Sequence, residues 1–382
     1  MINDEWAERY IFATSWVVID YWLLVICYWF RNLLVINFLH DFINLFVLTK
    51  LLSTSATKRR KSSNIFLSVS GVVKISSFII HRSSFMSVAP SAAFNTLAAA
   101  YDAAFTHTIT GRLQRQRVWH FARQRFEHLK SGAVRVLELN CGTGEDALWL
   151  ARQGFRVLAT DVSPEMVALA QHKVDALPEG GQIAVAVCDA RQLQAWLKAD
   201  GGKSRRALPS PPSSETGVSP FDVVFSNFGG LNCLSPEEMG RFGLAMRSAL
   251  LPGGHFVAVV MGRFCAWETL YFLLTGRLRQ AFRRLRRGPV AARLDAHSAV
   301  QTWYYSPREF AAFFPDFEVS AVRPIGIWLP PSYLDPFFRR FPRLMAVFNR
   351  LEMFFNAGCW ARGADPYLIS FVRSVEQFGG TE

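Results

Sequence analysis

A short apolar run that ends in a glycine turn constrains the fold of this chain more than any other stretch. Residues 134–139 read VRVLEL, and a Gly-x-Gly turn follows at Gly142 and Gly144. The next residues, 145–154, place apolar side chains on one helical face and close with Gly154. Glycines let the backbone turn sharply beside a ligand, and a helix start offers free N–H groups. The stretch therefore predicts a buried parallel strand, a ligand-binding loop and a helix.

Strands and helices are expected to alternate through the rest of the chain. Ser163-Pro164 and Ser306-Pro307 are typical helix starts, because Ser caps the first turn and Pro suits its first position. Further strands are predicted in the apolar runs 155–161, 182–190, 221–227, 250–262 and 366–373, and a further helix in 235–250. The alternation predicts a doubly wound α/β sheet, in which ligands bind beyond the carboxyl ends of the strands.

Polar residues stand at each of those predicted strand ends. Glu138 and Asn140 follow the first strand, Asp161 ends the second, Asp189 the third and Asn227 the fourth. Asp161 could accept hydrogen bonds from both hydroxyls of a ribose, Asp189 from an exocyclic amine, and Glu138 could face a cation. Asp is also favoured as a cap or turn residue, so a structural role stays open. Asn140 is expected to tolerate a left-handed turn.

The glycine loop alone does not identify its ligand, because GTGEDA also satisfies a dinucleotide-binding pattern. Its surroundings narrow the choice. VLELNCGTGEDALWLA, VLATDVSPEMVALA, CDA, FDVVFSNFGGLNCL and LLPGGHFVAVV occur in this order between residues 92 and 262. Together they resemble the motifs of class I S-adenosylmethionine-dependent methyltransferases, of the type 11/25-like domain.

That resemblance implies a Rossmann-like, mostly parallel seven-stranded sheet with helices on both faces and a substrate lid inserted after the fifth strand. It also implies S-adenosylmethionine as the cofactor. Tyr101 would cap the pocket, Glu138 would lie near the methionine amino group, and Asp161 would bind the ribose. The implied cofactor-binding residues are Tyr101, Glu138, Asn140, Gly142, Gly144, Asp161, Asp189, Ala190, Asn227 and Phe228. The chain departs from the motif at Asn140, which replaces the first glycine.

Methyl transfer mainly requires that an acceptor be aligned with an already activated methyl group, so neither a nucleophilic triad nor a metal is expected. A general base would help a hydroxyl acceptor. Glu268, His297 and His255 are candidates by residue type only, and a structural role is the alternative for each. His255 opens the fifth strand, at the end of the sheet away from the expected site.

The segment after the fifth strand, within a predicted substrate region 264–360, is basic and aromatic. Leu270, Leu274, Leu278, Phe282 and Leu285 recur at helical spacing on one face, with arginines mostly off it. Residues 268–288 are thus predicted to form a basic amphipathic helix. Such a helix could contact a membrane surface, or it could pack on the domain with a solvated arginine face.

A hydrophobic small molecule or a lipid-like compound is the expected acceptor. Trp303, Tyr304 and Tyr305 could wall its pocket, with core packing as the alternative. The net charge of +12 fits anionic partners in general and prompts nucleic-acid methylation as an alternative. The fourth motif, SNFG, lacks the paired prolines of enzymes that methylate nucleobase amines, so no nucleic-acid partner is expected. A non-catalytic or NAD-binding Rossmann-like protein is the other alternative.

Residues 1–85 differ in composition from the methyltransferase-like region 86–382. The run 11–30 is long enough to span a bilayer, although Asp20 lies near its centre. A membrane anchor, a signal peptide and a natural start at Met86 are the three interpretations, and Met86 is favoured. The Ser/Pro-rich insert 200–220 predicts a mobile surface loop. The six cysteines form no C-x-x-C pair, which favours a reducing cytoplasm.

Overall fold

The computed structural model describes residues 90–129, 134–199, 221–294 and 299–375. The expectations for residues 1–85, for the insert 200–220 and for His297 fall outside the described residues. Within the described ranges, no helix combines the length and the apolar character needed to cross a bilayer.

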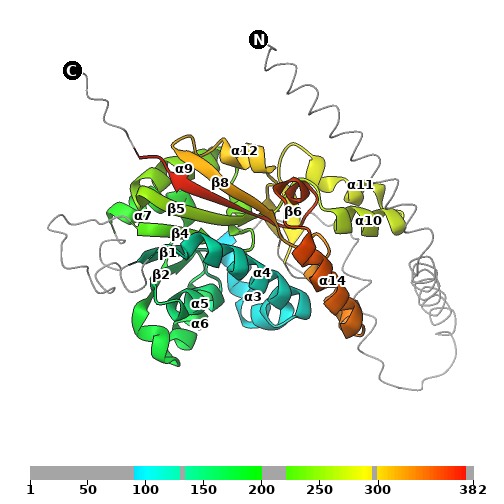
Figure 1. The fold of residues 1–382 in the computed structure, drawn as a ribbon, viewed down its shortest axis with the longest axis horizontal. Coiled ribbons are helices and arrows are strands. Elements are labelled where there is room, and N and C mark those ends of the chain that lie inside the picture. The colour runs from blue at the N-terminus through cyan, green and yellow to red at the C-terminus, as the bar shows by residue number, and fades with distance from the viewer. Residues whose placement is uncertain (1–89, 130–133, 200–220, 295–298, 376–382) are drawn as a thin grey trace, which may run out of the picture. The chain divides into compact units, whose positions relative to one another are not determined.

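The core of the fold is a seven-stranded sheet with strand order β3-β2-β1-β4-β5-β9-β8 (Figure 1). The strands are β1 (Arg135–Leu139), β2 (Arg156–Asp161), β3 (Ile183–Val187), β4 (Phe221–Ser226), β5 (Leu250–Val260), β8 (Phe317–Pro324) and β9 (Tyr367–Arg373). β1 to β5 are mutually parallel, whereas β9 runs antiparallel to both β5 and β8. The predicted Rossmann-like, mostly parallel sheet is confirmed.

Helices cover both faces of this sheet. The described helices, of which α4 to α6 and α7 with α9 pack on the two faces, are α3 (Pro90–Tyr101), α4 (Ile109–Phe126), α5 (Glu145–Arg152), α6 (Pro164–Asp175), α7 (Leu193–Lys198), α9 (Pro236–Ala249), α10 (Ala266–Leu274), α11 (Leu278–Ala281), α12 (Pro307–Ala311), α13 (Asp335–Phe338) and α14 (Pro342–Phe354). Short helical turns are η1 (Asp102–Thr106), η2 (Pro178–Gln182), η3 (Ala190–Gln192), η4 (Gly230–Cys233), η5 (Arg283–Leu285), η6 (Ser332–Leu334) and η7 (Gly358–Arg362).

Alternate side chains of each strand enter two separate cores. Val136 and Val157 pack with α4, α5 and α6 on one face of the sheet. Leu137 and Leu158 pack with α7 and α9 on the other. Both faces are therefore buried, which explains why β1 and β2 read as continuous apolar runs instead of alternating ones.

The predicted helix starts are confirmed by their caps. Ser163 accepts a hydrogen bond from the backbone N–H of Met166, with Pro164 in the first turn of α6. Ser235 and Ser306 open α9 and α12 in the same way, and each forms a capping box with a Glu three residues later. Each cap satisfies an N–H that the helix itself leaves unpaired.

The predicted single helix over 268–288 is wrong. The structure breaks it into α10, α11 and η5. Gly276 has a φ of +69°, a left-handed conformation that ends α10 and that glycine adopts without steric cost. Sequence analysis also missed β8 and a two-stranded hairpin of β6 (Val290–Arg293) and β7 (Ala299–Thr302).

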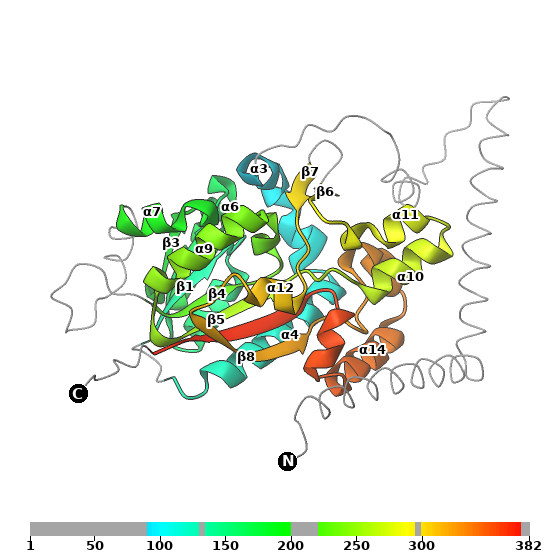
Figure 2. The same cartoon turned by 90° about the horizontal axis from the view of Figure 1, so that it is seen from above.

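The chain between β5 and β9 places α10, α11 and α14 beyond one end of the sheet (Figures 1 and 2). β9 runs away from these helices in both views, so the parallel strands run toward them and present their carboxyl ends there. Trp267 of α10 joins the helices, with ring centroids 5.7 Å from both Phe338 and Phe348. Glu352 of α14 accepts backbone N–H bonds from residues 326–328, which fixes α14 to the loop after β8.

Candidate cofactor site

The glycine loop between β1 and α5 forms the floor of a small cavity. Gly142 and Gly144 have φ values of +54° and +85°, where a side chain would be strained. A Cβ at Gly144 would also lie 3.0 Å from the Cβ of Ala170, so this glycine allows α6 to pack against the loop. Gly144 precedes the first residue of α5, whose N-terminus points its free N–H groups at this region.

The cavity measures about 20 Å³ and lies at the carboxyl ends of β1 and β4. Its lining residues are Tyr101, Arg115, Asn140, Cys141, Gly142, Thr143, Glu145, Asp146, Asn227 and Phe228. Five residues that the sequence proposed for the cofactor thus line one cavity: Tyr101, Asn140, Gly142, Asn227 and Phe228. The topology rule for parallel sheets explains why strand ends so far apart in the sequence meet here.

Two residues of this cavity hold strained backbone conformations. Asn140 has a φ of +58° and Phe228 a φ of +49°, and they are the only non-glycine residues with positive φ in the described part of the chain. Such conformations cost roughly 1–3 kcal/mol and gather at functional sites. The Asn140 side chain donates a hydrogen bond from Nδ2 to Ser226 Oγ at 3.1 Å. It fits because Gly230 faces it: a Cβ at position 230 would come within 2.5 Å of Asn140.

Asp146, in the first turn of α5, organises the polar side of the cavity. Its carboxylate accepts hydrogen bonds from Arg115 at 2.6 Å, from Trp119 Nε1 at 2.5 Å and from Asn227 Nδ2 at 3.0 Å. Burial alone would lower the pKa of Arg115, but the neighbouring Asp146 carboxylate raises it. The guanidinium also lies 4.8 Å from the centre of the Phe228 ring. A fixed, permanently charged cation therefore faces the cavity.

Sequence reasoning missed Arg115, Trp119 and Asp146. Asp146 lies within the quoted GTGEDA stretch and could have been noticed as an acid in the first helical turn. Arg115 and Trp119 lie on α4, 20 and 16 residues before the start of β1, and nothing in their spacing points to the loop. Only the packing of α4 on the sheet brings them to Asp146.

Glu138 is a buried carboxyl next to this cluster. Its side chain is 1% exposed, and its Oε2 atom has no hydrogen-bond partner among the described residues. Burial, and after it the nearby Asp146 carboxylate, raises the pKa of Glu138 well above its usual range. A buried polar atom without a partner costs free energy, so a ligand that brings an ammonium or another donor would be stabilised there.

Asp161 and Asp189 lie at the ends of β2 and β3 but do not line the cavity. Asp161 accepts backbone N–H bonds from Gly142 at 3.0 Å and from Ser163 at 2.9 Å, and burial raises its pKa. Each of its oxygens keeps one lone pair for a further donor. Asp189 forms a two-pronged ion pair with Arg191, with the shortest N–O distance 2.7 Å. Ala190 is buried beside it.

A cover formed by α3 and η1 closes the cavity. The ring of Phe105 in this cover contacts two other rings: its centroid lies 5.8 Å from that of Tyr101 and 4.7 Å from that of Phe228. Asp102 fastens the cover by accepting a hydrogen bond from Thr143 Oγ1 at 2.6 Å and pairing with Lys173 at 2.7 Å. A space of about 20 Å³ holds about one water molecule, so the cavity in this structure is smaller than a nucleoside cofactor.

The general-base candidates lie elsewhere. Glu268 accepts hydrogen bonds from Arg283 and Arg284 in a buried ionic cluster and does not line the cavity. His255 packs against His128, with their Nε2 atoms 3.1 Å apart. It lies in the middle of β5, which begins at Leu250, and not at the start of the strand as predicted, although it pairs with Val223 near the start of β4. His297 lies outside the described residues.

The three aromatic residues proposed for the substrate occupy different environments. Tyr305 is 4% exposed in the core, and its hydroxyl donates to the carbonyl of Leu234 at 2.7 Å. Tyr304 is buried beneath the guanidinium of Arg284, 4.7 Å from its ring centre. Trp303 is half-buried and packs against the core. None of the three lines the cofactor cavity, so the core-packing alternative describes Tyr305 best.

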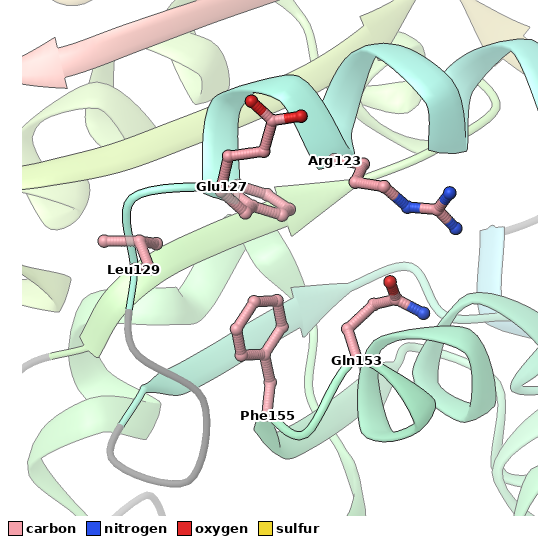
Figure 3. A pocket seen from close by; sticks show the side chains of 6 residues that line it. Arg123, Glu127, Leu129, Gln153 and Phe155 are labelled. Atoms are coloured by element: carbon pink, nitrogen blue, oxygen red, sulfur yellow. The ribbon is translucent and has the colours of Figure 1, made fainter.

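A second cavity lies at the opposite ends of the strands. It measures about 160 Å³, between the end of α4 and the turn that precedes β2 (Figure 3). Arg123, Glu127 and Leu129 line one side, and Gln153 and Phe155 the other. Phe155 directly precedes β2, which places this cavity at the amino ends of the parallel strands, away from the glycine loop. It is larger than the first cavity but holds none of the predicted site residues.

Comparison with known proteins supports the motif assignment. Residues 136–201 match the model of a family described as a methyltransferase domain. A Geobacillus sp. (strain WCH70) protein named as a candidate methyltransferase is 49% identical over 47 residues, which are 12% of this chain and 19% of that protein. The chain thus spans about a fifth of the length of this relative.

Two solved structures are similar at low sequence identity. One is an S-adenosylmethionine-dependent methyltransferase from Anabaena variabilis, with a TM-score of 0.46, 13% identity, and coverage of 78% of this chain and 99% of the other. The second is the methyltransferase CcbJ from Streptomyces caelestis, with a TM-score of 0.43, 16% identity, and coverage of 74% and 98%.

The family match begins inside β1, contains the whole glycine loop and runs through α5, β2, α6, β3 and α7. These elements carry the cavity floor and belong to the parallel part of the seven-stranded sheet. Residues 136–201 therefore match a methyltransferase-domain family, and they lie in the parallel part of the sheet.

Proposed function

We propose that this protein transfers a methyl group from S-adenosylmethionine to a small, apolar or lipid-like acceptor by in-line displacement. The observation that carries the proposal is the cavity at the carboxyl ends of β1 and β4. The glycine loop forms the floor of this cavity, hydrogen-bonded polar side chains around Asp146 form one side, and aromatic rings cover it.

The residues present fit such a cofactor. When bound, S-adenosylmethionine supplies a methyl group on a positively charged sulfur. Glu138, whose Oε2 atom has no described partner, would accept from the methionine ammonium, and the cationic Arg115 would attract the carboxylate. Asp161 has lone pairs left for the two ribose hydroxyls. Asp189 would accept a hydrogen bond from the adenine amine after one of its hydrogen bonds from Arg191 is broken.

The acceptor side of the proposal rests on the aromatic cover and on the chain after β5. Phe105 and Phe228 present apolar rings beside the cavity, and Tyr101 keeps its proton because burial raises its pKa to about 12. Such a wall favours an apolar acceptor, and closing it over the site excludes water from the reaction. Alignment of acceptor and methyl group within a closed site supplies much of the rate enhancement in a displacement of this kind.

Binding of the cofactor distinguishes this proposal from a dinucleotide-binding role. We expect isothermal titration calorimetry to detect one S-adenosylmethionine site per chain and no saturable binding of NAD. S-adenosylhomocysteine should compete, because it keeps every group that the loop contacts. Tight NAD binding with no binding of S-adenosylmethionine would contradict the assignment.

Asp161→Ala should weaken S-adenosylmethionine binding more than about tenfold, which corresponds to at least about 1.4 kcal/mol. The change removes the proposed ribose contacts and the acceptor that holds Gly142. Asp161→Asn keeps the shape of the side chain and should lose less affinity. Asp175→Ala, an exposed position on α6, is the matched control and should leave affinity unchanged. Equal affinities for the Asp161 and Asp175 variants in calorimetry, with circular dichroism confirming folded chains, would refute the role of Asp161.

A further inference from the structure

The apolar stripe predicted on residues 268–288 faces outward in the folded chain. The fractional exposures are 51% for Leu270, 47% for Leu274, 62% for Leu278, 45% for Phe282 and 51% for Leu285. Leu273 and Phe264 are exposed as well. Phe272 and Ala281 of the same segment are buried, so the segment packs on the domain through these residues and leaves the apolar stripe exposed.

The inner side of the same segment is ionic. Arg284 is 7% exposed and lies between Glu268, at 2.6 Å, and Asp365, at 2.7 Å. Arg283 also points to Glu268, at 2.6 Å. The two carboxylates together raise the pKa of Arg284, although burial acts against them. This buried cluster ties α10 and η5 to the chain ahead of β9, so the outward position of the leucines is held by strong contacts.

The remaining arginines surround the apolar side chains without acidic neighbours. Arg279, Arg286 and Arg287 are exposed and Arg277 is half-buried, and none of the four pairs with a carboxylate in the described part of the chain. Glu268 is the only acidic residue between positions 264 and 293, and it is buried.

The neighbouring α13 and α14 repeat this pattern. Residues 335–354, which form these helices and the turn between them, carry Arg339, Arg340, Arg343 and Arg350, all exposed, while the two acids, Asp335 and Glu352, are buried. Met353 and Phe354 at the end of α14 are 53% and 82% exposed. Apolar and cationic side chains therefore extend over both helical segments beyond the carboxyl ends of the strands.

We propose that the outer face of α10, α11 and η5 docks on an anionic phospholipid bilayer. We define this docking face by Leu270, Leu273, Leu274, Leu278, Phe282 and Leu285, with Arg277, Arg279, Arg286 and Arg287 at its border. Leucine and phenylalanine enter the headgroup boundary, and arginines attract anionic headgroups. Six large apolar side chains are thus exposed within residues 270–285, and exposed apolar patches mark interaction sites.

Charge complementarity decides among possible occupants. In a symmetric pair of chains the arginine borders of the two copies would face each other and repel, which disfavours self-association. RNA would satisfy the arginines but would leave six apolar side chains in water. A bilayer with anionic headgroups buries the apolar side chains and also attracts the arginines.

The docking face also accounts for the route of an apolar acceptor. α10 begins six residues after the end of β5, and Met261, directly after β5, lies against Gly229 at the end of β4. The face and the cofactor cavity thus share the carboxyl end of the sheet. Docking does not depend on the proposed methyl transfer, and its test below needs no cofactor.

Hydrogen–deuterium exchange of the full chain tests the proposal at the level of peptides. The chain is compared alone, with vesicles of phosphatidylcholine, and with vesicles of phosphatidylcholine mixed with phosphatidylglycerol. We expect slower exchange over residues 264–288 with the anionic vesicles only, and unchanged exchange over α9. Unchanged exchange over 264–288 would overturn the proposal, even if the chain associates with vesicles through residues 1–85.

Variants separate the apolar from the ionic contribution. Leu274→Glu with Leu278→Glu should abolish the protection, whereas Leu244→Glu, at a position 64% exposed on α9, should preserve it. Replacing Arg279 and Arg286 by Gln should weaken association with anionic vesicles by about fivefold per arginine. Circular dichroism and urea unfolding confirm that each variant stays folded. Protection by single-stranded RNA that survives the leucine changes, or a dimer in light scattering that those changes disrupt, would each assign the face to another partner.

Discussion

At the scale of single residues, the site depends on the pairing of Asn140, which departs from the resembled motif, with Gly230, which leaves room for it. Asn140 stands where the resembled motif has glycine, and it keeps a left-handed backbone at a φ of +58°. Its side chain occupies the space that Gly230 leaves empty, and its hydrogen-bond partner, Ser226, lies 86 residues later in the sequence. The residue expected to tolerate a left-handed turn does so, and it also links β1 to Ser226 at the end of β4.

Gly230→Ala tests this pairing. The new Cβ would lie 2.5 Å from Asn140, so we expect a loss of about 1–3 kcal/mol in the free energy of unfolding, as for overpacked sites. Adding Asn140→Gly should restore most of that loss, because glycine suits the positive φ and removes the clash. Gly240→Ala on α9 is the control, since a Cβ there meets no other atom within 4 Å. Urea unfolding gives the free energy of unfolding of the parent chain, the two single variants and the double variant. A double variant no more stable than Gly230→Ala would disprove the coupling between the two residues.

At the scale of elements, the proposed cofactor entry depends on the α3–η1 cover and the proposed membrane docking on the outward face of α10. Helix starts, strand ends and the glycine turn follow local rules, so Ser163, Ser235 and Gly142 could be placed from the sequence. The direction in which an amphipathic segment faces depends on its partners. Nothing local reveals that Arg284 meets Asp365, 81 residues later, and turns the leucines outward.

Asp102 should control the opening of the cover. Burial alone would raise the pKa of Asp102, but hydrogen bonds from Lys173 and Thr143 outweigh it and lower the pKa, so the carboxylate stays charged at neutral pH. Asp102→Ala removes both contacts and should make association and dissociation of S-adenosylmethionine severalfold faster in stopped-flow fluorescence. Glu237→Ala, which breaks only an exposed pair with Arg241, is the control. Rates equal to those of the parent chain would show that the Asp102 contacts do not limit entry.

At the scale of the whole molecule, the parallel half of the sheet was predictable and the antiparallel edge was not. β1 to β5 are short apolar runs between turn signals, buried on both faces, and the motifs fix their order. β8 carries exposed or half-buried side chains at most positions, so its sequence lacks that signal. Glu268 illustrates the same limit for the site, because its residue type suggested a base and its packing makes it an ion-pair partner.

The most direct test of the central claim follows the methyl group itself. The purified chain is incubated with methyl-tritiated S-adenosylmethionine and the chloroform-soluble fraction of a cell extract, and the labelled product is identified by mass. We expect radioactivity in an apolar product with the parent chain and with Asp175→Ala, and at least about tenfold less with Asp161→Ala when S-adenosylmethionine is well below saturation. Label that stays in S-adenosylmethionine with all extract fractions, or that enters only nucleic acid, would contradict methyl transfer to an apolar acceptor.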